Sequence, residues 1–137
     1  MNLSSFTENT SNPSLSRAVI KQFGRWTDWK ESASDIAAYG AASGFNGFIY
    51  HVDTVAFYEA NKGNIHALAR DAAEEAGGSN LLSEFLASFN CVDLQADEVE
   101  RALYHGDDHG DYTQVANAFA WFALEETAHD YVNQLER

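Results

Sequence analysis

The strongest constraint on how this chain can fold is a long helical pattern near its C-terminus. Between Tyr112 and Leu135, apolar residues recur every three or four positions, which is the period of one face of an α-helix. Shorter segments with the same period precede it, and most of them begin at a capping residue or end at a glycine. The sequence therefore predicts an all-α protein, a compact bundle of about six helices.

The same pattern gives the approximate places of the helices. Helices are expected at residues 14–23, 35–39, 55–60, 65–76, 82–89, 98–105 and 112–135. Ser14 and Asp97 are predicted N-caps, and Gly63 is expected to break the chain between two of these helices. The run Phe48–Val52 is β-like but has no partner strand, so at most a minor extended segment is expected near residues 47–52.

The length of 137 residues favours one domain over residues 1–137, with residues 1–13 as a flexible arm because they are polar and aperiodic. Cys91 is the single cysteine, so no intramolecular disulfide can form. The N-terminus lacks the pattern of a signal peptide, and no apolar run reaches the ~20 residues of a membrane span. We therefore expect a protein of the bacterial host cytoplasm.

Charge is distributed very unevenly along the chain. There are 8 basic and 21 acidic side chains, a formal charge of −13. Residues 71–136 hold fifteen acids against one base, Arg101, whereas residues 1–30 carry a small positive excess. A strongly negative protein is repelled by nucleic acid and by anionic membranes, so neither is expected as a direct partner.

The acidic residues fall into clusters at helical spacing, and we predict that these clusters form the partner-binding surface. Like charges one turn apart destabilise a helix mildly, and carboxylates repeated every ~5–10 Å resemble a row of phosphates. Such a surface could occupy a basic nucleic-acid-binding groove. The predicted contact residues are Asp71, Glu74, Glu75, Asp97, Glu98, Glu100, Asp107, Asp108, Asp111, Glu125, Glu126 and Asp130.

Signatures of catalysis are missing from the sequence. It contains no nucleophile elbow, no phosphate-binding loop and no His-Glu-x-x-His motif. His105 and His109 enclose two aspartates, but neighbouring glycines predict a loop there, and Glu126 with His129 is a single Glu-x-x-His pair where a di-iron site needs two. We therefore expect a protein that is not an enzyme and holds no metal or cofactor.

Several segments resemble a family of small acidic proteins from bacteriophages and mobile elements that has no assigned activity. The resembling stretches are Ser11–Ile20, Tyr39–Tyr50, Asp53–Tyr58 and Asn117–Glu126. In size and charge the chain is similar to antirestriction and anti-CRISPR inhibitors. The resemblance implies no catalytic residue.

The function predicted from these observations is inhibition of a host nucleic-acid-binding defence complex, either a CRISPR surveillance complex or a restriction system, through an acidic surface that mimics DNA. Two alternatives remain open. One is a helical adaptor that docks through Trp26, Trp29 and Trp121. The other is a small metal-dependent enzyme that uses His105, His109 and His129.

Overall fold

The computed structural model describes residues 3–10, 12–23, 29–39, 54–75, 94–104 and 109–135, and these residues form helices without any strand. The helices are α1 (Leu3–Glu8), α2 (Pro13–Phe23), α3 (Trp29–Tyr39), α5 (Thr54–Glu75), α7 (Ala96–Tyr104) and α8 (His109–Leu135). The all-α prediction is confirmed. The expected extended segment at 47–52 and the expected helix at 82–89 lie outside the described residues.

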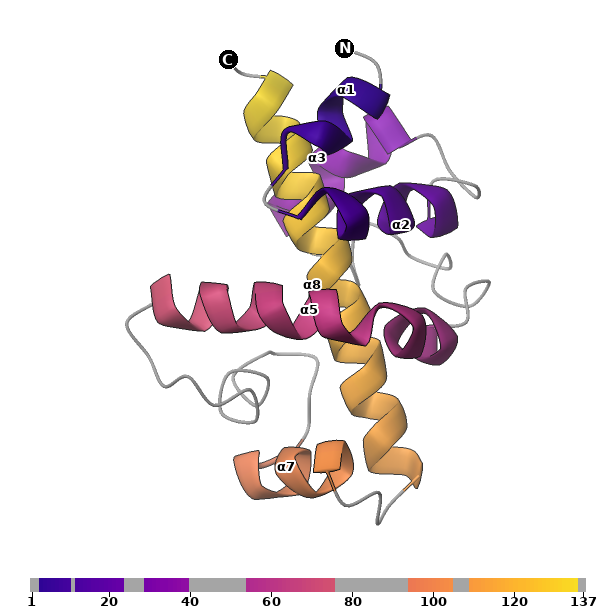
Figure 1. Cartoon of the computed structure of the whole chain (residues 1–137), viewed down its shortest axis with the longest axis vertical. Coiled ribbons are helices and arrows are strands. Elements are labelled where there is room, and N and C mark those ends of the chain that lie inside the picture. The colour runs from indigo at the N-terminus through magenta and orange to yellow at the C-terminus, as the bar shows by residue number, and fades with distance from the viewer. Residues whose placement is uncertain are drawn as a thin grey trace.

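Helix α8 runs the length of the molecule, and the other helices pack around it (Figure 1). Helices α1, α2 and α3 gather near the end that holds both termini, α5 crosses the middle, and α7 lies at the other end. The middle of α8 is apolar on all sides, with Ala116, Phe119, Ala120, Ala123 and Leu124 fully buried. A helix that is apolar all round is buried by several neighbours, which is why α8 serves as the central element of this fold.

The N-terminal residues do not form the flexible arm that the sequence predicted. Residues 3–8 are helical, and the Phe6 side chain is fully buried. Its ring meets the ring of Tyr131 edge-on at a centroid distance of 5.0 Å, and the side chain of Gln134 donates a hydrogen bond to its carbonyl oxygen. One aromatic side chain therefore holds a polar segment against the C-terminal part of α8.

The start of α2 also differs from the prediction. Asn12, not Ser14, caps this helix: its side-chain oxygen accepts a hydrogen bond from the backbone N–H of Leu15 at 3.1 Å. Pro13 then occupies the first helical position, where its missing N–H costs nothing. Helix α3 begins at Trp29, six residues before the expected Asp35, while the last helix begins at His109, close to the predicted Tyr112.

Helix α5 replaces the two helices expected around Gly63. The chain stays helical through Gly63, and the only irregular backbone inside α5 is at Asn61 (φ −121°, ψ 15°). The Asn61 side chain donates to the carbonyl oxygen of Phe57 at 2.9 Å, which satisfies an acceptor near the kink. The expected break is therefore present but lies at Asn61, two residues before Gly63, and α5 consists of two helical segments on either side of this kink. Gly63 itself stays helical, because a glycine in a helix costs only about 1 kcal/mol, less than packing along the helix can provide.

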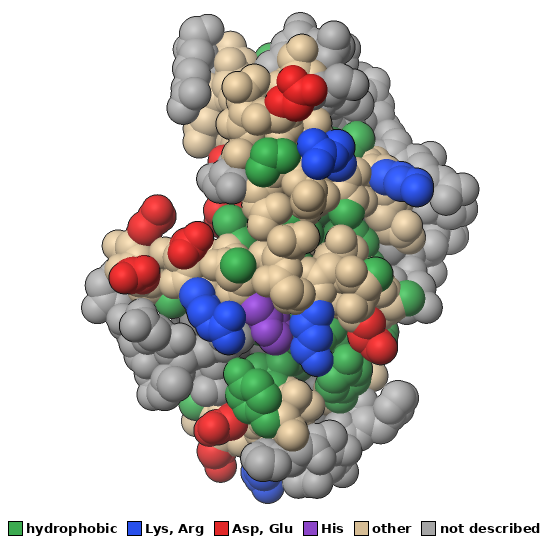
Figure 2. Space-filling view, in the orientation of Figure 1, with side chains coloured by type: hydrophobic (Ala, Val, Ile, Leu, Met, Phe, Trp, Pro, Cys, Tyr) green, Lys and Arg blue, Asp and Glu red, His purple; other side chains and the backbone are tan. Residues whose placement is uncertain are grey.

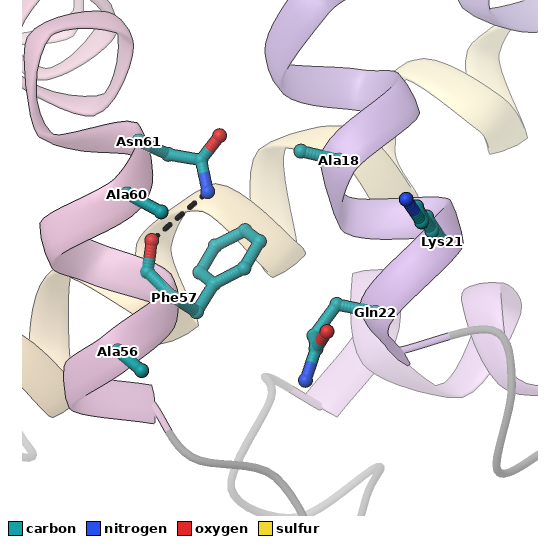
Figure 3. Close-up of a pocket in the computed structure, with 7 residues that line it drawn as sticks. All are labelled: Ala18, Lys21, Gln22, Ala56, Phe57, Ala60 and Asn61. Carbon is teal, nitrogen blue, oxygen red and sulfur yellow. Dashed lines mark hydrogen bonds between the residues drawn. The ribbon is translucent and has the colours of Figure 1, made fainter.

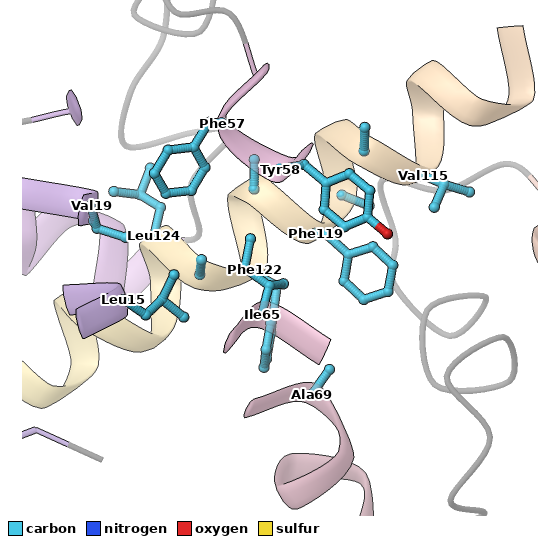
Figure 4. Close-up of a cluster of buried hydrophobic side chains, with 14 of the residues drawn as sticks. Leu15, Val19, Phe57, Tyr58, Ile65, Ala69, Val115, Phe119, Phe122 and Leu124 are labelled. Carbon is cyan, nitrogen blue, oxygen red and sulfur yellow. The ribbon is translucent and has the colours of Figure 1, made fainter. Parts of the chain in front are cut away.

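The core lies where α5 crosses α8, with α2 covering one side (Figure 4). The rings of Tyr58 and Phe119 stack in parallel with centroids 5.2 Å apart, and Leu15 and Val19 approach from α2. Near the start of α5, the hydroxyl of Thr54 donates to the side-chain oxygen of Asn117 on α8. These contacts set the position of the first half of α5 relative to α8.

Candidate functional site

The C-terminal end of α5 carries an exposed group of carboxylates. Asp71, Glu74 and Glu75 are all exposed, and Figure 2 shows acidic side chains gathered at this end of the helix. The last turn of α5 contains no basic residue. Negative charge at a helix C-terminus opposes the helix dipole, so this placement is unfavourable for the helix.

The predicted acidic residues of α8 are less exposed than expected. Glu125, Glu126 and Asp130 are only partly exposed, because α8 is covered by neighbouring helices along most of its length. Burial raises the pKa of the Glu126 carboxyl, and the negative charges of Asp130, Glu125 and Glu75 raise it further, while His129 lowers it. The charge of Glu75 reaches Glu126, so the structure brings the end of α5 and the middle of α8 into one electrostatic environment. We call these residues the acidic surface: Asp71, Glu74, Glu75, Glu125, Glu126 and Asp130.

The predicted acidic cluster on α7 has a local structural role. Glu98 accepts a hydrogen bond from the backbone N–H of Gln95 at 3.2 Å, so Gln95 is the N-cap and the predicted cap Asp97 lies inside the first turn. Asp97 pairs with Arg101 at 3.8 Å, and both side chains are well exposed. Carboxylates in the first turn of a helix are favoured by its dipole. The α7 cluster therefore needs no partner to account for it.

The remaining predicted residues are placed only in part. Asp107 and Asp108 lie outside the described residues, and Asp111 lies in the first turn of α8. For the metal alternative, His105 lies outside the described residues, and His109 begins α8 where a loop was expected. The described part of the chain contains no group of three or more His, Cys, Asp or Glu side chains arranged to hold a metal ion.

Of the three tryptophans of the adaptor alternative, Trp121 is the one whose side-chain surroundings the structure describes. Trp121 is partly buried and packs against the hydrophobic core. Its indole N–H is buried and finds no hydrogen-bond acceptor among the described residues. Trp29 begins α3, and Trp26 lies outside the described residues.

A buried polar pair on α5 was not anticipated from the sequence. The hydroxyl of Tyr58 and Nε2 of His66 lie 2.7 Å apart, and the His66 ring packs on Phe119 at a centroid distance of 4.9 Å. Burial, with the charges of Lys62 and Arg70, lowers the pKa of His66 from 6.5 to about 4. Burial is also the main cause of a raised pKa at Tyr58. Both groups are therefore neutral at pH 7.

The signal for this pair was present in the sequence as a regular spacing. Tyr58, Lys62, His66 and Arg70 follow one another at intervals of four residues. Residues at that spacing lie on one face of a helix, but the kink at Asn61 separates Tyr58 from the other three, so the spacing was a partial signal. It groups Lys62, His66 and Arg70, whereas the contact of Tyr58 with His66 depends on the geometry of the kink.

A pocket of about 280 Å³ lies between α2 and α5 (Figure 3). Phe57 and three alanines supply an apolar lining, and Lys21, Gln22 and Asn61 add polar groups. One N–H of Asn61 is already bonded to the carbonyl oxygen of Phe57. The pocket holds none of the predicted contact residues.

Among the described helices, none has both the length and the apolar character needed to cross a membrane. No curated protein and no solved structure matches the chain significantly. A model for a domain of unknown function, DUF7222, matches residues 11–137, nearly the whole chain. The chain therefore belongs to the DUF7222 family.

Proposed function

We propose that this protein is a non-catalytic inhibitor that places its acidic surface in the basic nucleic-acid-binding groove of a partner protein. The observation that carries the proposal is the group of exposed carboxylates Asp71, Glu74 and Glu75 at the C-terminal end of α5, where no basic residue of the last turn offsets them. The charge of Glu75 also helps to raise the pKa of Glu126 on α8, so the two acidic clusters influence each other electrostatically. Within the described ranges, no ion pair neutralises Asp71, Glu74 or Glu75.

The position of these carboxylates supports a role in binding more than a role in folding. At the end of α5 they oppose the helix dipole and repel one another, each effect costing a few tenths of a kcal/mol. On α7, by contrast, the carboxylates cap the helix or pair with Arg101. A partner that supplies positive charge would turn the unfavourable arrangement on α5 into a favourable one.

The chemistry of the acidic surface defines the kind of partner. A nucleic acid normally releases its condensed counterions when its phosphates bind a groove lined by Lys and Arg, and a surface of fixed carboxylates can take the place of those phosphates. Nucleic acid itself is repelled by a chain of charge −13. The partners proposed from the sequence are a CRISPR surveillance complex or a restriction enzyme of the bacterial cytoplasm, and the inhibitor competes there with DNA or RNA.

The test is displacement of labelled DNA from such purified complexes, followed by fluorescence anisotropy. The wild-type protein should displace DNA, and the displacement should weaken steeply with ionic strength. The triple variant Asp71→Asn, Glu74→Gln, Glu75→Gln should inhibit at least tenfold less well and yet unfold at a slightly higher temperature, because it removes repulsion at the helix end. A wild-type protein that displaces nothing from any of these complexes contradicts the proposal.

A matched control separates the acidic surface from the effect of total charge. The variant Glu8→Gln, Asp35→Asn, Glu59→Gln removes the same number of charges from exposed positions on α1, α3 and the first half of α5. We expect it to keep most of the inhibition, with a change of threefold or less. Equal losses in the two triple variants would show that only net charge matters and that the acidic surface is not the contact.

A further inference from the structure

A short basic stripe on α5 stands out in this acidic chain. Lys62, His66 and Arg70 follow one another at one-turn intervals on the part of α5 that lies beyond the kink, so they share one face of the helix. Eight residues at 1.5 Å each separate the Cα atoms of Lys62 and Arg70 by about 12 Å, and their long side chains can close over the histidine between them. On the face shown in Figure 2, a histidine lies at the surface between two basic side chains.

The two cations of the stripe are without a carboxylate partner in the described part of the chain. The ion pair found there joins Asp97 and Arg101 on α7. Lys62 instead places its Nζ 5.6 Å from the centroid of the Tyr58 ring, and Arg70 is exposed. Two neighbouring bases without a carboxylate partner are notable in a protein with 21 acidic and 8 basic side chains. The positive charges of both help to lower the pKa of His66.

One ring nitrogen of His66, Nε2, already takes part in a hydrogen bond, whereas the other, Nδ1, is available for a ligand. Nε2 is bonded to the Tyr58 hydroxyl at 2.7 Å, and the ring is fixed against Phe119. Because Tyr58 is protonated, its hydroxyl can donate to Nε2. In that tautomer the neutral imidazole carries its proton on Nδ1. The stripe then presents a neutral N–H donor between an ammonium and a guanidinium group.

We propose that Lys62, His66 and Arg70 form a binding site for the phosphate group of a small phosphorylated molecule. An ammonium, a guanidinium and an imidazole N–H can each donate to a different oxygen of a tetrahedral phosphate. The proposal is independent of the acidic surface, because none of these three residues belongs to it.

The surroundings of the stripe suggest what the phosphate is attached to. Tyr104 at the end of α7 is 59% exposed, one of two large hydrophobic side chains found exposed in the described part of the chain, and it is among the groups that raise the pKa of Tyr58. Aromatic side chains next to cations stack readily on nucleobases. The negative charge of Glu59 helps to raise the pKa of Tyr58 and of Tyr112, and the same charge opposes the binding of an anion. We therefore take a nucleoside monophosphate as the ligand, because stacking of its base on Tyr104 would offset the repulsion from Glu59.

The test uses calorimetry and NMR on the full chain at constant ionic strength, with inorganic phosphate and adenosine monophosphate as the probes. Either probe should raise the pKa of His66 from about 4 by at least one unit, because the negative charge of a bound phosphate group stabilises the imidazolium form and offsets the positive charges of Lys62 and Arg70. The double variant Lys62→Gln, Arg70→Gln should bind at least tenfold more weakly. A His66 pKa that neither probe changes overturns the proposal.

Two further variants complete the test. Arg17→Gln with Lys21→Gln removes the same charge from exposed positions on α2, and should bind the probes as the wild type does. If it loses as much affinity as the α5 variant, binding is non-specific and the proposal is wrong. Tyr104→Ala should weaken adenosine monophosphate severalfold and leave inorganic phosphate unchanged; equal affinity of this variant and the wild type for the nucleotide would overturn the nucleotide assignment.

Discussion

The hydroxyl of Tyr58 lies 2.7 Å from Nε2 of His66, two turns further along α5, and both side chains are buried against Phe119 of α8. The hydrogen bond satisfies two polar groups that would otherwise be costly to bury. It also spans the kink at Asn61 and so connects the two halves of α5 through their side chains. The shape of α5 at its kink therefore affects where His66 lies in the basic stripe formed with Lys62 and Arg70.

His66 should make the stability of the protein depend on pH in a defined window. Its pKa is about 4 in the folded protein and 6.5 when unfolded, so the unfolded chain binds the proton first as the pH falls. The stabilising contribution is complete above pH 6.5 and decreases as the pH falls towards 4. Its size is below ~3.5 kcal/mol, which is the shift from 6.5 to about 4 at about 1.4 kcal/mol per pKa unit, because solvent screens part of the interaction.

The measurement is urea unfolding of the wild type and of His66→Gln from pH 8 to pH 4. The difference between the two free energies of unfolding should be constant above pH 7 and should shift in favour of the variant as the pH falls through the window. Taking the difference between the two free energies of unfolding removes the contribution of the carboxylates, because they titrate in both proteins. Two curves that stay parallel throughout would contradict the assignment of a buried, neutral His66.

Phe6 should contribute strongly to stability although it lies near the end of the chain. Its ring is fully buried and contacts Tyr131. Phe6→Ala is expected to lower the free energy of unfolding by about 3 kcal/mol, typical of a buried aromatic side chain. The exposed Glu8 on the same helix provides the control, and Glu8→Gln should change stability by less than ~0.5 kcal/mol. If the two variants are equally stable, residues 3–8 do not pack on α8 and the flexible arm predicted from the sequence is correct after all.

These examples show which parts of the fold the sequence could predict. Helix α8 was predicted because its apolar residues recur every three or four positions, a pattern that can be recognised from the sequence alone. Helix α1 was missed because its burial depends on a single ring, Phe6, and on a partner at the other end of the chain. A lone aromatic among polar residues has no period, so no local pattern could reveal its contact.

The acidic surface, too, could be predicted from the sequence only in part. Helical spacing predicted correctly that Asp71, Glu74 and Glu75 share a surface. The effect of the Glu75 charge on the pKa of Glu126 depends on how α5 crosses α8. The spacing of residues within either helix does not specify that crossing. The exposure of the α8 acids was overestimated for the same reason, since a helix in the centre of the fold has no fully solvated face.

Glu126 should destabilise the folded protein at neutral pH. Burial and neighbouring negative charges raise its pKa above 4.5, so the fold favours the protonated carboxyl. Above the folded pKa, an ionised Glu126 therefore opposes folding, and this penalty disappears as the pH falls to the unfolded value and below. Glu126→Gln mimics the protonated form. Thermal unfolding should show that the variant is more stable than the wild type at pH 7 and equally stable near pH 4; an advantage that persists unchanged at pH 4 would mean that ionisation is not its cause.

Gly63 should be a position where alanine improves the protein. It lies in an exposed, helical part of α5, and a Cβ atom added there meets nothing within 4 Å. Glycine loses more backbone freedom on folding than alanine does, so Gly63→Ala should raise the free energy of unfolding by about 0.5–1 kcal/mol. The reciprocal control is Ala67→Gly, one turn further along the same exposed helix, which should lower it by about 1 kcal/mol. Urea unfolding of both variants decides between two descriptions of α5. A chain that is helical at Gly63, with its kink at Asn61, predicts changes of opposite sign, whereas a chain that breaks at Gly63 itself, as the sequence pattern suggested, predicts that both substitutions destabilise.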